Sequence, residues 1–214
     1  MPPPHDLQKF FSILLNRERQ GSMQILHLVS HPSQEHLPVA SVSIPINIDT
    51  IRPLLRFSNM RKIYLLMVNL DFSDEHLTAM ATAWPYLEVF DFNNGDSWAT
   101  PYNITLRGLF SLVNMCPHLK SAHLAINANV LEGTEDCPAS MIGAKNLQHL
   151  VLGDTVVENP RAVALVVYLA LPKVEKIVAS NTWSHVAPTN DPPWAKLNEY
   201  LEAFRLLQGG RWKA

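Results

Sequence analysis

The sequence predicts a repeating α/β fold, in which each unit supplies one strand of a parallel sheet and one helix. The first observation is an apolar spacing of the form L-x-x-L-x-L, which is clearest at Leu87, Phe90 and Phe92. Further copies lie at Met60, Ile63, Leu65; Leu119, Ala122, Leu124; Leu147, Leu150, Leu152; and Val174, Ile177, Ala179, with looser copies at Met23, Leu26, Leu28 and Val39, Val42, Ile44. The second observation is the interval between copies, because the first apolar positions 60, 87, 119, 147 and 174 are about 27 to 32 residues apart. A near-constant period of this size is the signature of a structural repeat.

This pattern is typical of a leucine-rich-repeat solenoid, a horseshoe with a parallel sheet on its concave face and helices outside, here with about six to seven repeats. Two apolar residues that are two positions apart point to the same side of a strand, so that side faces the helix of its own unit. We expect a single domain over 1–214, with a capping helix in 1–22, repeats over 23–180, and a Pro-rich loop and capping helix over 181–214. The cap is expected because a repeat array must shield its last apolar edge.

The order of the elements follows from apolar periodicity and from helix-capping residues. The expected strands are 24–29, 40–44, 62–68, 88–92, 120–126, 148–152 and 175–179. The expected helices are 7–15, a turn through 51–57, a helix with the stripe Leu77, Met80, Ala81 and Trp84, and then 106–115, 161–170 and 194–207. Side chains suited to cap them are Asp6, Asp49, Ser73 or Asp74, Thr105 and Asn159. Because 161–170 is apolar on most sides, we expect that helix to be well buried.

The residues between the inward apolar positions should form columns on the concave face, which is the usual binding surface of solenoids. One column is His27, Ser43, Tyr64, Asp91, His123, Val151 and Val178, and its neighbour is Ile25, Ser41, Lys62, Val89, Ser121, His149 and Lys176. The candidate partner-binding residues are Lys62, Tyr64, Val89, Asp91, Ser121, His123 and His149. A solvated sheet face without a ligand is the alternative interpretation of the same residues.

Composition and charge argue against several classes of function. A net charge of −2 without a dense Lys/Arg run does not favour a nucleic-acid binder, whose affinity depends on phosphate contacts. The longest apolar run, 162–171, is shorter than the ~20 residues that a membrane helix needs. The N-terminus lacks the pattern of a signal peptide, and Cys116 and Cys137 form no C-x-x-C pair. We therefore expect an intracellular protein, cytoplasmic or nuclear, without membrane association.

We expect neither a catalytic residue, nor a metal, nor a cofactor. His27, His31 and His36 are close in sequence but lack a second ligand pair, and nucleotide-binding glycine motifs and a G-x-S-x-G motif are missing. Asp91, Asn93 and Asp96 resemble a calcium loop, but Gly95 is one place early and Tyr102 stands where the bidentate Glu belongs. A hydrolase that uses His123 with Asp91 and Ser121 is the less favoured alternative, because a plain hydrogen bond between neighbouring strands explains these residues equally well.

Several phrases, in order, resemble the leucine-rich-repeat region of fungal F-box proteins over roughly 23–177. They are Ile51-Arg52-Pro53-Leu54-Leu55-Arg56-Phe57, Ala83-Trp84-Pro85-Tyr86-Leu87, Thr105-Leu106-Arg107-Gly108-Leu109 and Cys116-Pro117-His118-Leu119. The resemblance implies that the repeats recognise an unknown target protein and that an N-terminal F-box docks on the Skp1 adaptor of a ubiquitin ligase. The expected F-box opening is not found, since Leu37-Pro38-Val39-Ala40 does not fit. Adaptor binding is therefore expected only if an F-box exists upstream, and a stand-alone repeat scaffold or a fragment is the alternative.

Overall fold

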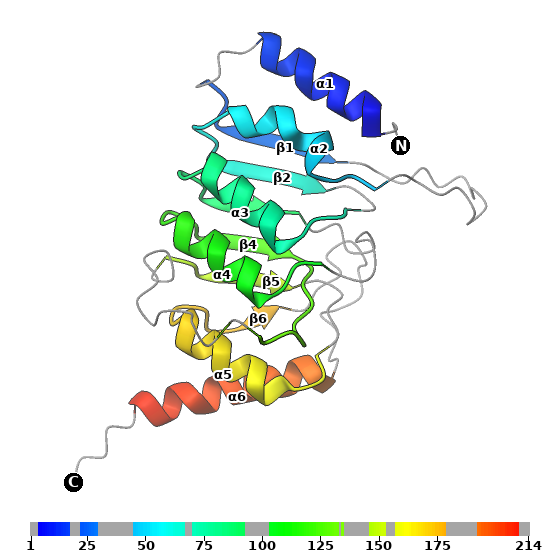
Figure 1. Ribbon diagram of the computed structural model, residues 1–214. Helices are drawn as coiled ribbons and strands as arrows, with labels where there is room; N and C mark the ends of the chain where they lie inside the picture. The colour runs from blue at the N-terminus through cyan, green and yellow to red at the C-terminus, as the bar shows by residue number, and fades with distance from the viewer. Residues whose placement is uncertain are drawn as a thin grey trace.

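A six-stranded parallel sheet forms the centre of the computed structural model, which describes residues 4–17, 22–29, 45–66, 70–92, 103–132, 134, 146–152, 157–178 and 192–209 (Figure 1). The strands are β1 (Ile25–Val29), β2 (Lys62–Leu66), β3 (Val89–Asp91), β4 (Ser121–Leu124), β5 (His149–Leu152) and β6 (Ile177–Val178). They lie in chain order, and each pairs in parallel with the next. The backbone ladder begins one residue before most strands, as when Lys120 N–H donates to Glu88 O at 2.9 Å.

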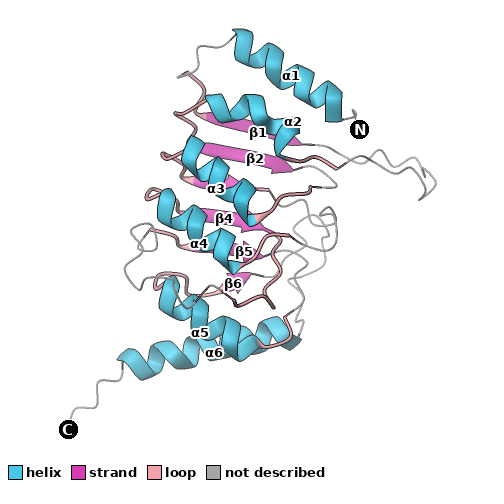
Figure 2. Cartoon of the chain, in the orientation of Figure 1, coloured by secondary structure: helices cyan, strands magenta, loops and turns pink. Residues whose placement is uncertain are grey.

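Most of the helices lie along one face of the sheet, and the first and the last lie at its two ends, as Figure 2 shows. They are α1 (Pro4–Arg17), α2 (Ile48–Ile51), the 3₁₀ helix η1 (Arg52–Arg56), α3 (Asp74–Ala83), α4 (Leu106–Met115), α5 (Pro160–Ala170) and α6 (Pro192–Gly209). Neighbouring parallel strands need a crossover connection, and α2 with η1, α3, α4 and α5 supply four of the five, while the described residues include no helix between β4 and β5. None of the described helices combines the length and the apolar character needed to cross a membrane.

The apolar spacing that predicted the repeat fills the core between sheet and helices. Ile63, Leu65, Phe90, Phe92, Ala122, Leu124, Leu152 and Ile177 are fully buried, together with Trp84 at the end of α3. The indole N–H of Trp84 donates to Leu54 O at 3.2 Å, which satisfies the one polar atom of this side chain. The predicted α/β class and six of the expected strands are therefore confirmed.

The seventh expected strand, 40–44, lies outside the described residues. Its expected place in the sheet, between the first and the third strand candidates, is wrong, because β1 pairs directly with β2 from Ile25↔Lys62 to Val29↔Leu66. Alternation of polar and apolar residues indicates a strand but does not say which strand it pairs with.

Helix capping was predicted correctly at three helices and incorrectly at two. Ser73 caps α3, Thr105 caps α4 and Asn159 caps α5, where Pro160 occupies the first turn. The cap before α2 is Asn47, whose side chain accepts from the backbone N–H of Asp49 and Thr50, so the prediction of Asp49 is wrong. Likewise α1 begins at Pro4, which places Asp6 inside the first turn rather than at the cap.

The two terminal helices and the last crossover helix, α5, are buried on one side and exposed on the other. On α1, Leu7 and Phe11 are buried while Phe10 is 47% exposed, and on α6, Leu197 and Leu201 are buried while Leu207 is 75% exposed. The expectation that α5 is well buried is met on one side only, because Val163, Ala164, Val167 and Ala170 are buried whereas Leu165 and Leu169 are exposed. The remaining side of α5 packs on α6, where Tyr168 and Phe204 lie 5.8 Å apart between ring centroids.

Candidate functional site

The predicted columns lie on the sheet face that points away from α2–α5, which is the face that the sequence predicts to be concave. We call it the outer face, because it is not covered by these helices. Strand register aligns one column as His27, Tyr64, Asp91, His123, Val151 and Val178. It aligns the neighbouring column as Ile25, Lys62, Val89, Ser121 and His149. The columns were therefore predicted correctly for these residues. Ser41 and Ser43 lie outside the described residues, and their expected position between the residues of β1 and those of β2 is wrong because β1 pairs directly with β2. Lys176, the last member of the second predicted column, precedes β6 and is not part of the strand register.

All seven predicted site residues lie on this face. Lys62, Tyr64, Val89, Asp91, Ser121 and His123 are half-buried and His149 is exposed. The residues that alternate with them, such as Ile63, Leu65, Phe90 and Ala122, are fully buried against the helices. This alternation is the period of two expected of a strand with a core on one side.

The first contact on the outer face is aromatic. The rings of His27 and Tyr64 lie on adjacent strands with centroids 5.0 Å apart and planes tilted by 52°. Cross-strand ring pairs of this kind fix each other's orientation. Tyr64 therefore presents a large, oriented surface near the β1–β3 end of the outer face.

A polar chain of three side chains lies further along the face. His123 Nδ1 is 3.0 Å from Asp91 Oδ2, and His123 Nε2 is 3.2 Å from Ser121 Oγ. Asp91 and His123 face each other across β3 and β4, and Ser121 lies two residues before His123. These three residues form the set of the hydrolase alternative predicted from the sequence, and the structure brings all three together.

A row of charges runs along the amino-terminal edge of the sheet. Glu88 accepts from Arg61 at 2.7 Å and from Lys120 at 3.0 Å, so its carboxylate links three consecutive units. These two hydrogen bonds, that from Lys120 first, hold the pKa of the Glu88 carboxyl below its ordinary value of 4.5. This row was not predicted, although each of the three residues directly precedes a strand, namely β2, β3 and β4.

A second unpredicted contact joins consecutive units at the start of their helices. Asp74, which is only 8% exposed, accepts from the Thr105 N–H and from the Thr105 hydroxyl, both at 2.7 Å. Arg107 Nε lies 3.4 Å from the same carboxylate. A hollow of about 380 Å³ adjoins this group. The sequence offered one indication of this contact, because it contains two possible caps for α3. Ser73 is the cap, which leaves the Asp74 carboxylate to bind Thr105.

Metal-ligating side chains do not gather in the part of the chain that the structure describes. His31 and His36 lie outside it, as do Asn93 and Asp96 of the calcium-like stretch. Cys116 is buried, and burial raises the pKa of its thiol to about 12. A thiol in this state is a poor metal ligand and a poor nucleophile.

A larger cavity, of about 810 Å³, lies at the β4–β6 end of the outer face. Besides Ser121, His123 and His149 it is lined by Lys173, Lys176 and Arg205. We call it the basic pocket. Lys176 was predicted in the second column but not among the site residues. Arg205 could not be predicted from the strand pattern, because it lies on α6.

Comparisons with known proteins do not indicate a function, so the proposal below depends on the geometry of the outer face. No protein-family model matches the chain, and no curated protein is significantly similar to it.

Proposed function

We propose that the chain is a leucine-rich-repeat module that binds a partner protein through its outer face. The repeated apolar spacing, with one strand and in most units one helix between copies, supports this proposal. So does a parallel sheet whose strands follow chain order, because each unit then contacts mainly its neighbours. In such arrays the strand face is an extended surface suited to recognition.

The observation that carries the proposal is the pair of register-aligned columns. They combine rings (His27, Tyr64), charges (Lys62, Asp91) and apolar side chains (Val89, Val178) on one surface. Interface residues of this mixture supply contact area through the aromatics and orientation through the charges. Several of these side chains are half-buried, so they lose little rotamer freedom when a partner covers them.

A role in target recognition for a ubiquitin ligase is the form of this function that the resemblance to fungal F-box proteins favours. Docking on the Skp1 adaptor would need an F-box upstream of the repeats. Coexpression of this chain with the adaptor separates the two forms, and we expect no copurification. Stoichiometric copurification would contradict that expectation, whereas its absence fits a scaffold without a ligase role. We place the protein in the cytoplasm or nucleus, which imaging of a tagged chain tests.

The binding function is tested by quantitative affinity capture with two tyrosine variants. Tyr64→Ala removes a ring from the outer face, while Tyr86→Ala removes a ring that is 49% exposed in the turn between α3 and β3. We expect proteins captured by the wild type and by Tyr86→Ala to be lost with Tyr64→Ala. Equal capture by the two variants would contradict binding through the outer face.

A hydrolase is the second candidate, because Ser121, His123 and Asp91 form the hydrogen-bonded order of a nucleophile, a base and an orienting carboxylate. Against it, the backbone N–H of Ser121 donates to Glu88 O at 3.3 Å. It is therefore engaged and does not point to a developing oxyanion, whose stabilisation is usually the largest contribution to acyl transfer.

Labelling with a fluorophosphonate separates the two candidates. A hydrolase predicts labelling that is lost in Ser121→Ala and in His123→Ala but kept in Ser111→Ala, whose hydroxyl lies on α4. The binding module predicts no labelling of the wild type. Site-specific labelling of Ser121 would favour the hydrolase.

A further inference from the structure

The basic pocket has a different character from the rest of the molecule. The chain carries a net charge of −2, yet the cationic side chains Lys173, Lys176 and Arg205 line this cavity together, against the one carboxylate of Glu175. Within the part of the chain that the structure describes, neither Lys173 nor Lys176 forms a salt bridge. A concave surface lined by one sign of charge concentrates the field and attracts a ligand of the opposite sign.

The third cation is held in place by the fold. Arg205 of α6 donates to Glu175 O at 2.7 Å and also to Val174 O. These bonds fix the guanidinium beside the start of β6 and use only some of its five N–H donors. Because the side chain is already ordered, a carboxylate that binds it does not have to immobilise it.

The floor of the cavity is apolar. Val151 and Val178 are register partners on β5 and β6, and Val178 is 37% exposed. Val151 is 8% exposed and lies deeper. An apolar side chain between two acidic groups would cover Val178 while its neighbours reach the cations. The volume of about 810 Å³ accommodates several residues of an extended chain.

We propose that the basic pocket binds an acidic segment of the partner protein, in which Asp and Glu residues flank an apolar side chain. This inference rests on the proposed function and names the chemistry of the partner. The carboxylates lie against Lys173, Lys176 and Arg205, and the apolar side chain lies on Val178. His149, which is exposed and lines the same cavity, adds a further polar group to the site.

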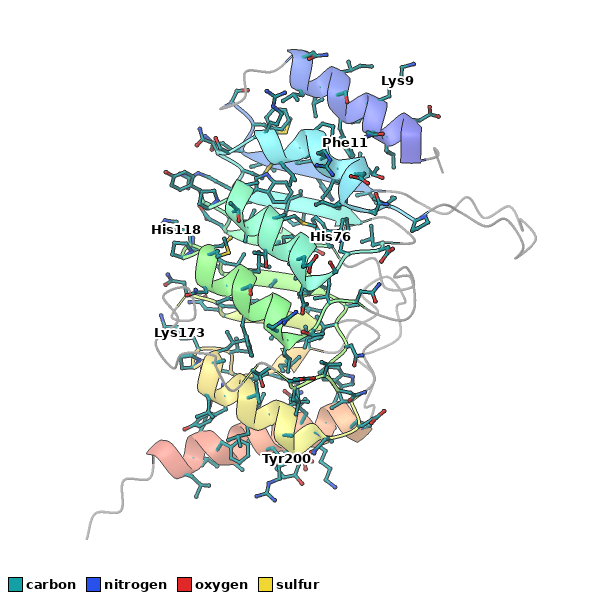
Figure 3. The ribbon with its side chains drawn as sticks, viewed as in Figure 1. Lys9, Phe11, His76, His118, Lys173 and Tyr200 are labelled. Atoms are coloured by element: carbon teal, nitrogen blue, oxygen red, sulfur yellow. The ribbon has the colours of Figure 1, made fainter. Side chains whose placement is uncertain are left out.

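The test is a fluorescence-anisotropy titration of the purified full chain with a labelled synthetic peptide in which Asp and Glu flank a central Leu. We expect the double variant Lys173→Glu, Lys176→Glu to weaken binding at least about tenfold, since like charges then face the peptide. The matched control is Lys9→Glu, Arg56→Glu, which changes the net charge equally. Both control residues are exposed at the β1–β2 end, and Figure 3 shows Lys9 on α1 far from Lys173. The control should bind like the wild type.

Two further arms make the result decisive. A peptide with Asn and Gln in place of the acids should bind at least about tenfold more weakly. Raising the salt concentration from about 50 mM to about 500 mM should weaken the binding of the acidic peptide. The milder double variant Lys173→Ala, Lys176→Ala serves as a check on folding. If its melting temperature is unchanged, its weaker binding of the peptide is not caused by a folding defect. Absence of wild-type binding, equal weakening by the control variant, or equally tight binding of a single-stranded oligonucleotide would overturn the proposal. If the tyrosine comparison shows outer-face capture while the acidic peptide fails, only this inference is lost and the binding function stands.

Discussion

Asn198 of α6 forms a two-bond bridge to the backbone of Ile177 in β6. Its side-chain oxygen accepts from the Ile177 N–H and its side-chain nitrogen donates to the Ile177 carbonyl, both at 2.9 Å. β6 is the last strand of the sheet, so these backbone groups have no strand beyond them among the described elements. An edge strand with unpaired backbone groups is a template for aggregation, and here a side-chain amide takes the place of the next strand.

Asn198→Ala should therefore destabilise the protein although it removes no apolar surface. Two part-buried backbone groups lose their partner, which costs about 1–3 kcal/mol in the free energy of unfolding. Urea unfolding measures this loss. The control is Asn114→Ala on the exposed side of α4, which should change the free energy of unfolding by less than about 0.5 kcal/mol. Equal effects of the two variants would show that the bridge does not protect the edge.

Gly108→Ala should also destabilise, against the usual sign for a helix. Ala normally stabilises a helix interior by roughly 0.5–1 kcal/mol relative to Gly. A Cβ at position 108 would lie 2.2 Å from Asp74 Oδ1 and 3.0 Å from the Asp74 Cα, so α3 and α4 would have to separate. In a double-mutant cycle with Asp74→Ala, the double variant should lose less stability than the sum of the single variants. A stabilised Gly108→Ala would contradict the close contact.

The elements and columns could be predicted because they depend on local spacing. Leu87, Phe90 and Phe92 point inward for the same reason in every copy, and the residues between them must point outward. Contacts that depend on distant segments could not be predicted. Arg205 and Asn198 reach β6 from a helix that follows it by many residues, and Leu165 is exposed because α6 covers only one side of α5. The Asn47 cap was missed because Asn47 and Asp49 have equal capping propensity, and only the backbone decides between them.

The row Arg61–Glu88–Lys120 predicts a pH dependence of stability. The pKa of Glu88 is lower in the folded protein, so its contribution is fully present above the ordinary value of 4.5 and is lost as pH falls through the folded pKa. The difference in unfolding free energy between wild type and Glu88→Gln should vanish in that acid range. It should stay below about 1 kcal/mol at neutral pH, because Arg61 and Lys120 are largely exposed, and shrink in high salt. A difference that grows as pH falls would contradict the assignment.

Cys116 should resist alkylation in the native protein. Its thiol is buried, lies 3.5 Å from Trp84 O as a donor, and has a pKa raised to about 12, so the thiolate is scarce at neutral pH. In a Cys137→Ser background, iodoacetamide should label the remaining thiol only as fast as the protein unfolds. The same variant in denaturing urea is the control and should react at once. Rapid labelling without denaturant would place Cys116 at the surface.

The measurement that tests the outer face most directly is a pair of unfolding curves for adjacent residues of β2. Leu65 is fully buried against the helices, and Leu65→Ala should cost about 2–5 kcal/mol through lost burial and a cavity. Tyr64 lies on the outer face, so Tyr64→Ala should cost less than about 1 kcal/mol and leave a folded protein. If Tyr64→Ala loses as much free energy of unfolding as Leu65→Ala, the result would mean that the assigned orientation of the strand is wrong by one residue. Every side chain assigned to the outer face would then point at the helices, where no partner can reach it.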